Sequence, residues 1–125
     1  MASKLSGKNA CRGDKGEILL ITGNRLSMRK WQELPSSHQQ EQTAHSNDYE
    51  TLGYVIRGRA VLRYDADWPD RDRATEEKSV PISALKSRLE LTEGDSWIVP
   101  AGVVHAYEVM EHFEAIEATS PPTHA

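Results

Sequence analysis

The 125-residue sequence is poor in several features that carry particular functions. It has a single cysteine, Cys11, so it can form no internal disulfide and offers no pair of thiolates to zinc. No apolar run is long enough to cross a membrane, and residues 1–16 lack the apolar stretch of a secretory signal. We therefore expect a cytoplasmic protein with no membrane partner.

Basic charge is also scarce. Lysine and arginine number 15 against 19 aspartates and glutamates, which gives a net charge of -4. Proteins that bind nucleic acid backbones need clustered basic side chains, whereas the arginines here alternate with acidic residues. No glycine-rich loop followed by lysine is present, and no Gly-x-Ser-x-Gly turn. We expect no nucleic acid partner. We also expect no glycine-rich phosphate-binding loop and no serine nucleophile of the Gly-x-Ser-x-Gly type.

Short β-rich runs separated by turn residues dominate what is present. The length suits one domain, and the apolar content of 38% is typical of globular proteins. The clearest runs are 17–22, 52–56, 59–64, 96–99 and 113–118, with no regular alternation of strands and helices. This pattern predicts an all-β fold, an antiparallel barrel or a two-sheet jelly roll.

Composition sets the expected boundaries of the domain. Residues 1–16 are polar and predict a flexible tail, residues 17–122 the barrel, and residues 123–125 a short C-terminal tail. Within the barrel, residues 65–87 form an insertion dense in charge and turn formers. A solvated insertion and a lid over a pocket both remain open for this segment.

A hairpin is predicted at the centre of the chain. Residues 52–56 and 59–64 are two β-rich runs, and Arg57 and Gly58 separate them. Glycine adopts the left-handed backbone that a tight turn requires.

The most specific local signal lies in residues 94–105 (GDSWIVPAGVVH). Gly94 opens a strand, the turn from Pro100 to Gly102 closes it, and His105 begins the next strand. These four residues resemble the second sequence motif of the cupin superfamily, in which a glycine precedes Pro-x-Gly and a histidine.

The segment from His45 to Gly58 resembles the first cupin motif, but incompletely. The family usually has His-x-His, then a glutamate, then a glycine. His45 matches the first histidine, whereas Asn47 stands at the second. Thr51 stands where the glutamate is expected, and Glu50 is one residue early. Because strand side chains alternate, this offset turns Glu50 outward unless a bulge restores it.

The resemblance implies a small single-domain barrel of cupin type 2, a double-stranded β-helix with a central cavity. It also implies a divalent metal site in which His45, Glu50 and His105 are the ligands and Asn47 replaces the usual second histidine. Such ligands suit iron, manganese, nickel or zinc and leave open positions for substrate. Some members of the family have lost these ligands and keep the barrel as a scaffold.

Strand alternation extends the expected pocket. If His105 faces inward, Tyr107 and Val109 share its wall. Val55 and Trp97, from other strands, are expected to join them. The result is an apolar pocket with a few polar groups, as small-molecule sites usually are.

Three functions remain open from the sequence. The first is a small-molecule-binding barrel, with or without a metal. The second is a metal-dependent dioxygenase or isomerase, and the third is a metal-free scaffold that acts through dimer contacts. We also expect a homodimer, because antiparallel barrels with open sheet edges need those edges covered.

Overall fold

The structure, a computed structural model, describes residues 2–35, 43–65 and 80–124. Within these ranges the chain consists of antiparallel strands and two short 3₁₀ turns, Gly7–Asn9 (η1) and Ile82–Ala84 (η3). No helix in these ranges has the length and apolarity needed to span a membrane. The strands are β1 (Cys11–Arg12), β2 (Ile18–Thr22), β3 (Ser27–Glu33), β4 (Thr43–Ala44), β5 (Glu50–Arg57), β6 (Arg59–Tyr64), β7 (Val80–Pro81), β8 (Ser87–Thr92), β9 (Ser96–Val99), β10 (His105–Val109) and β11 (Phe113–Ser120).

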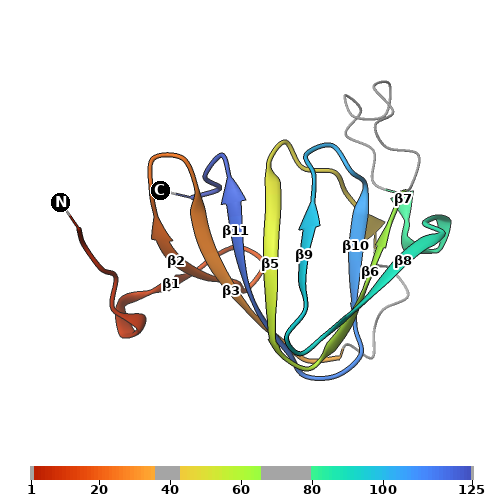
Figure 1. Cartoon of the computed structure of the whole chain (residues 1–125), viewed down its shortest axis with the longest axis horizontal. Helices are drawn as coiled ribbons and strands as arrows, with labels where there is room; N and C mark the ends of the chain where they lie inside the picture. The colour runs from red at the N-terminus through yellow and green to blue at the C-terminus, as the bar shows by residue number, and fades with distance from the viewer. Residues whose placement is uncertain (1, 36–42, 66–79, 125) are drawn as a thin grey trace.

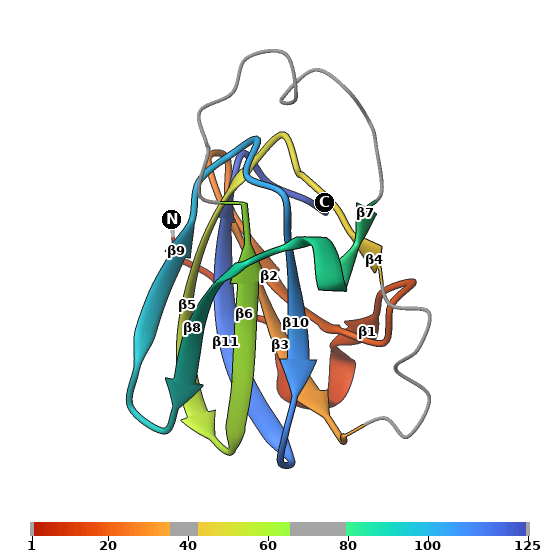
Figure 2. The same ribbon diagram turned by 90° about the vertical axis from the view of Figure 1, so that its right-hand side faces the viewer.

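Two sheets face each other across the interior. The larger has six strands in the order β1-β2-β3-β11-β5-β9, and the smaller has three in the order β10-β6-β8. Figure 1 shows most strands of the larger sheet side by side, and Figure 2 looks at the smaller sheet with the larger one behind it. β4 and β7 form a separate short pair. The predicted all-β jelly-roll barrel is confirmed.

The predicted hairpin is wrong. β5 pairs with β11 and β9, whereas β6 pairs with β10 and β8, so Gly58 carries the chain from one sheet to the other. Gly58 has a φ of 88°, and a Cβ built on it would overlap the carbonyl oxygen of His112. The turn chemistry was predicted correctly, but a tight glycine turn serves a corner between sheets as well as a hairpin.

Part of each predicted tail is attached to the larger sheet. In the segment predicted as a flexible N-terminal tail, β1 pairs with β2. At the other end, the backbone N–H of Thr123 donates to Ser27 Oγ at 2.9 Å. The Nε2 atom of His124 lies 2.8 Å from the carbonyl oxygen of Leu20. Residues 11–12 and 123–124, in the two predicted tails, thus extend the hydrogen bonding of the barrel.

The charged insertion is described only in part. Residues 66–79 lie outside the described residues. The two interpretations of this segment, a solvated insertion and a lid over a pocket, fall on these residues. Its last residues form β7 and the η3 turn, and β8 begins at Ser87.

Side chains alternate between the interior and the surface along the strands. In β11, every second residue from Phe113 to Thr119 is buried, including Glu117 at 2% exposure. This strand therefore carries a carboxylate on the face that its apolar residues turn into the barrel. The apolar core between the sheets consists of Val55, Ala60, Leu62, Leu91, Trp97, Val99, Val103, Phe113 and Ala115.

Candidate functional site

The two segments that carry the motif resemblance lie side by side, because β5 pairs with β9 (Figure 1). The backbones of His45 and His105 form an antiparallel bridge with N–O distances of 3.1 and 3.0 Å. The N–H of Gly102 also donates to the carbonyl of Asn47 at 2.8 Å. Because directly opposite residues of such a bridge point to the same side, the two imidazoles are neighbours.

His105 faces the barrel interior as a neutral ring. It packs edge-on against Tyr107, with ring centroids 5.6 Å apart. Its Nδ1 lies 2.9 Å from the carbonyl oxygen of Val103, which only accepts, so Nδ1 carries the proton. Burial lowers the pKa of His105 and outweighs the Val103 bond and the Glu117 charge, which favour protonation. At neutral pH the ring therefore keeps a lone pair on Nε2.

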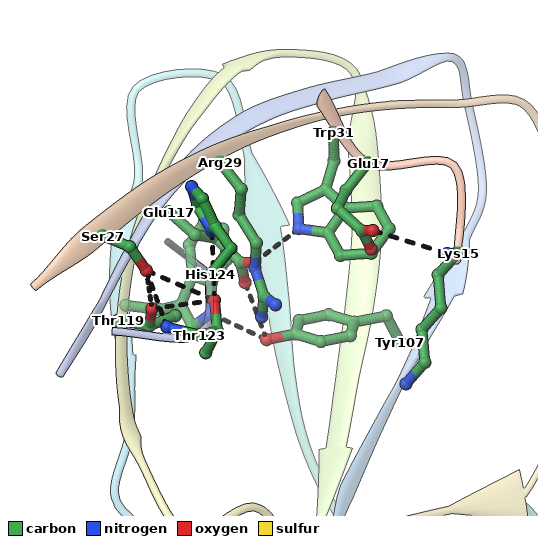
Figure 3. A network of polar contacts seen from close by, with 11 residues as sticks. Lys15, Glu17, Ser27, Arg29, Trp31, Tyr107, Glu117, Thr119, Thr123 and His124 are labelled. Atoms are coloured by element: carbon green, nitrogen blue, oxygen red, sulfur yellow. Dashed lines mark hydrogen bonds and ion pairs between the residues drawn. The ribbon is translucent and has the colours of Figure 1, made fainter. Parts of the chain in front are cut away.

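Glu117 is the centre of a polar cluster inside the barrel (Figure 3). Its Oε1 accepts hydrogen bonds from Arg29 Nε at 2.8 Å and from the indole N–H of Trp31. Its Oε2 accepts from the Tyr107 hydroxyl at 3.5 Å. That hydroxyl in turn accepts from the indole N–H of Trp97 at 3.2 Å. Both sheets thus contribute donors to one buried carboxylate.

Strand register brings this cluster together. Arg29 lies directly opposite Glu117, two residues before Trp31 on the inward face of β3. Sequence reasoning missed both members of this ion pair, because Arg29 is adjacent to another basic residue, Lys30, and its partner is 88 residues away. One signal was available: the alternation that buries Phe113 continues to Glu117.

Charge within the cluster is internally compensated. Burial acts to lower the pKa of Arg29, but the Glu117 carboxylate and Tyr49 outweigh it, and the pKa is raised. The guanidinium also lies over the rings of Trp31 and Tyr49, at 5.4 and 5.6 Å from their centroids. Burial, and then Glu117, raise the pKa of Tyr107, so its hydroxyl stays protonated. The cluster thus holds a guanidinium–carboxylate pair and a neutral phenol.

A cavity of about 200 Å³ lies beside the cluster, between the sheets. Of the residues predicted to line a pocket, Trp97, Tyr107 and Val109 line it, whereas Val55 is fully buried in the core and does not. His105 is not part of the lining, so the cavity lies on the far side of Tyr107 from the motif histidine. The lining residues are Arg29, Trp31, Glu33, Trp97, Tyr107, Val109, Phe113 and Glu117.

A second, more open cavity of about 260 Å³ lies at the edges of β8 and β9. It is larger, but apolar side chains such as Leu89 and Ile98 dominate its walls and its charged group is Asp65. Residues 66–79, which follow Asp65, lie outside the described residues. The cavity beside Glu117 is the better candidate because several polar groups converge on it.

Solved structures provide the comparison. No family model matches the sequence, and no curated protein matches it. An RmlC-like cupin from Shewanella frigidimarina NCIMB 400 superposes with a TM-score of 0.66 at 19% identity, covering 97% of this chain and 92% of that one. KdgF from Halomonas sp. superposes with a TM-score of 0.61 at 14% identity, covering 97% and 94%. This chain has a cupin fold.

A further cupin-fold match is a variant of oxalate decarboxylase from Bacillus subtilis. Its TM-score is 0.66 at 17% identity, and the match covers 97% of this chain but 30% of that one. At such identities the shared property is the fold alone, and the site must be argued from the residues of this chain.

In this cupin fold the predicted metal ligands do not come together as a set of three. His45 and His105 are neighbours, but Glu50 is exposed on β5 while the next residue, Thr51, is 2% exposed and faces inward. The pairing of β5 with β11 is regular at this point, so no bulge turns Glu50 back. Within residues 2–35, 43–65 and 80–124, no group of three His, Cys, Asp or Glu side chains is placed to hold a metal. These residues do not fit a His–His–carboxylate centre.

Proposed function

We propose that this chain binds a small organic molecule in the cavity beside Glu117. The supporting observation is the lining: aromatic walls from both sheets, with Arg29, Tyr107 and the two carboxylates at defined positions. Small-molecule sites combine apolar walls with a few fixed polar groups in this way. About 200 Å³ corresponds to the volume of about seven water molecules, which suits a small organic compound.

A neutral aromatic probe tests this proposal. We expect 2-phenylethanol to quench or shift tryptophan fluorescence saturably, with a Kd on the order of 1 mM, because Trp31 and Trp97 line the cavity. Val109→Phe fills part of the cavity and should weaken binding at least about tenfold. The measurement is a fluorescence titration, repeated by calorimetry.

The matched control is Leu26→Phe, which adds an aromatic ring at an exposed position outside the cavity lining. This variant should bind the probe as the wild type does. Equal affinities in the Val109→Phe variant and the wild type, with both proteins folded, would contradict binding at this cavity.

A metal-dependent dioxygenase or isomerase is the weaker candidate, because Glu50 is directed away from the two histidines. Two imidazoles alone hold these metals weakly, so we expect protein purified without chelator to carry less than about 0.1 equivalents of iron, manganese, nickel or zinc. Plasma mass spectrometry measures this content. Near-stoichiometric metal that His105→Ala abolishes would instead support the enzyme.

The homodimer stays a prediction, and the structure offers it a surface. Leu52, Tyr54 and Ile98 are 49%, 52% and 50% exposed, and Leu52 and Ile98 are directly paired. These apolar side chains lie on the outer face of the larger sheet, where packing against a second copy would bury them. This surface is a sheet face, whereas the contact expected from the sequence is at sheet edges.

A further inference from the structure

We propose that the ligand of this cavity is a small organic cation, an ammonium or guanidinium group on an apolar body, with its charge placed against Glu33. The inference rests on the proposed binding function and adds the charge class of the ligand.

Glu33 is a carboxylate in the cavity wall that has no cation partner among residues 2–35, 43–65 and 80–124. It ends β3 opposite Phe113, and in the described part of the chain its side chain has neither a hydrogen bond nor an ion pair. Glu17, 7% exposed, lies close enough to repel it, and the hydrogen bond of the Glu17 carboxylate is from the backbone N–H of Lys15 at 3.4 Å. Burial, and then the like charge of Glu17, raise the pKa of Glu33. A bound cation would relieve both costs.

The charge balance of the lining favours the same ligand class. Its charged side chains are Arg29, Glu33 and Glu117. Arg29 is paired with Glu117 at 2.8 Å, so the charge left over is the negative charge of Glu33. An organic anion would meet this carboxylate at short range inside a partly desolvated site, whereas a cation would be attracted to it.

The walls also suit an organic cation. Trp31, Trp97 and Phe113 line the cavity, and aromatic faces attract ammonium and guanidinium groups. The barrel already holds one such group in this manner, because Arg29 is stabilised by a carboxylate and by two rings. At the other end of the cavity, Glu33 and the rings offer comparable groups to a cation from outside.

Three probes of similar shape separate charge from shape: 2-phenylethylammonium, 2-phenylethanol and phenylacetate, each titrated by calorimetry at neutral pH. We expect the ammonium to bind at least about tenfold more tightly than the alcohol, and phenylacetate to bind more weakly than the alcohol. Glu33→Gln should reduce the affinity for the ammonium to that for the alcohol and leave alcohol binding unchanged. Glu93→Gln, an exposed carboxylate outside the cavity, is the matched control and should change neither.

The Glu33→Gln variant is expected to fold. The raised pKa means that ionised Glu33 costs stability above that pKa, and the cost disappears as pH falls. The variant should therefore melt no lower than the wild type at neutral pH. Equal or tighter binding of the alcohol or phenylacetate, or an ammonium preference that survives Glu33→Gln, overturns the cation inference while the binding function stands. Failure of all three probes to bind removes both.

Discussion

Replacing Arg29 with methionine is expected to lower the free energy of unfolding by about 3–5 kcal/mol, measured by urea denaturation. The substitution keeps most of the apolar volume but removes the cation that faces Glu117. This carboxylate is 2% exposed, so water cannot replace the lost partner. The remaining donors to it, Trp31 and Tyr107, are neutral and cannot compensate a buried charge.

A double-mutant cycle identifies the pair as the cause. Glu117→Gln removes the charge, so adding it to Arg29→Met should recover at least about 2 kcal/mol of the loss. Arg59→Met is the matched control, because its partner Glu90 has a side chain 56% exposed and the loss there should stay below about 1 kcal/mol. Similar losses in the Arg29 and Arg59 variants would contradict a buried ion pair at the centre of the barrel.

Gly58→Ala is expected to destabilise the fold by about 2–5 kcal/mol. The residue has a φ of 88°, where an alanine is strained, and the new Cβ would overlap the backbone carbonyl of His112. The adjacent Arg59 carbonyl accepts hydrogen bonds from Met110 and Glu111, at 2.9 and 3.1 Å. The loop between β10 and β11, which carries His112 and would have to move, is therefore held in place.

Gly94→Ala separates the two causes. Gly94 has a φ of 90°, but a Cβ there meets no atom within 4 Å, so only the backbone strain of about 1–2 kcal/mol applies. Thermal and urea unfolding of the two variants side by side gives the difference. If both variants lose the same stability, the close approach of Gly58 to His112 contributes nothing to the loss in Gly58→Ala.

The fold was predictable because its signals are local. Turn residues such as Gly58 and Gly94 have positive φ, and the strand predicted at 96–99 is β9. Pairing is not local: β5 and β6 follow each other in the chain yet lie in opposite sheets. A short-range pattern predicts a turn, but which sheet the next strand joins depends on contacts distant in sequence.

The candidate site was predictable only on one side. Resemblance to the second cupin motif directed attention to His105, and alternation from it reached Tyr107 and Val109. Arg29 is adjacent to Lys30, and Glu117 lies between Ile116 and Ala118, and only the register between β3 and β11 shows that they meet inside. Alternation from Phe113 indicates that Glu117 points inward, but short spacing does not show which residue of another strand faces it.

The position of the bound ligand is the most direct test of binding in the cavity beside Glu117. We propose a titration of 2-phenylethylammonium into isotope-labelled protein, followed by nuclear magnetic resonance of the indole N–H groups of Trp31 and Trp97 and the ring C–H groups of His45 and His105. We expect saturable shifts of both indole signals, with the His45 signals unchanged. Saturable shifts at the two histidines with both indole signals unchanged would place the ligand at the motif end and contradict binding beside Glu117.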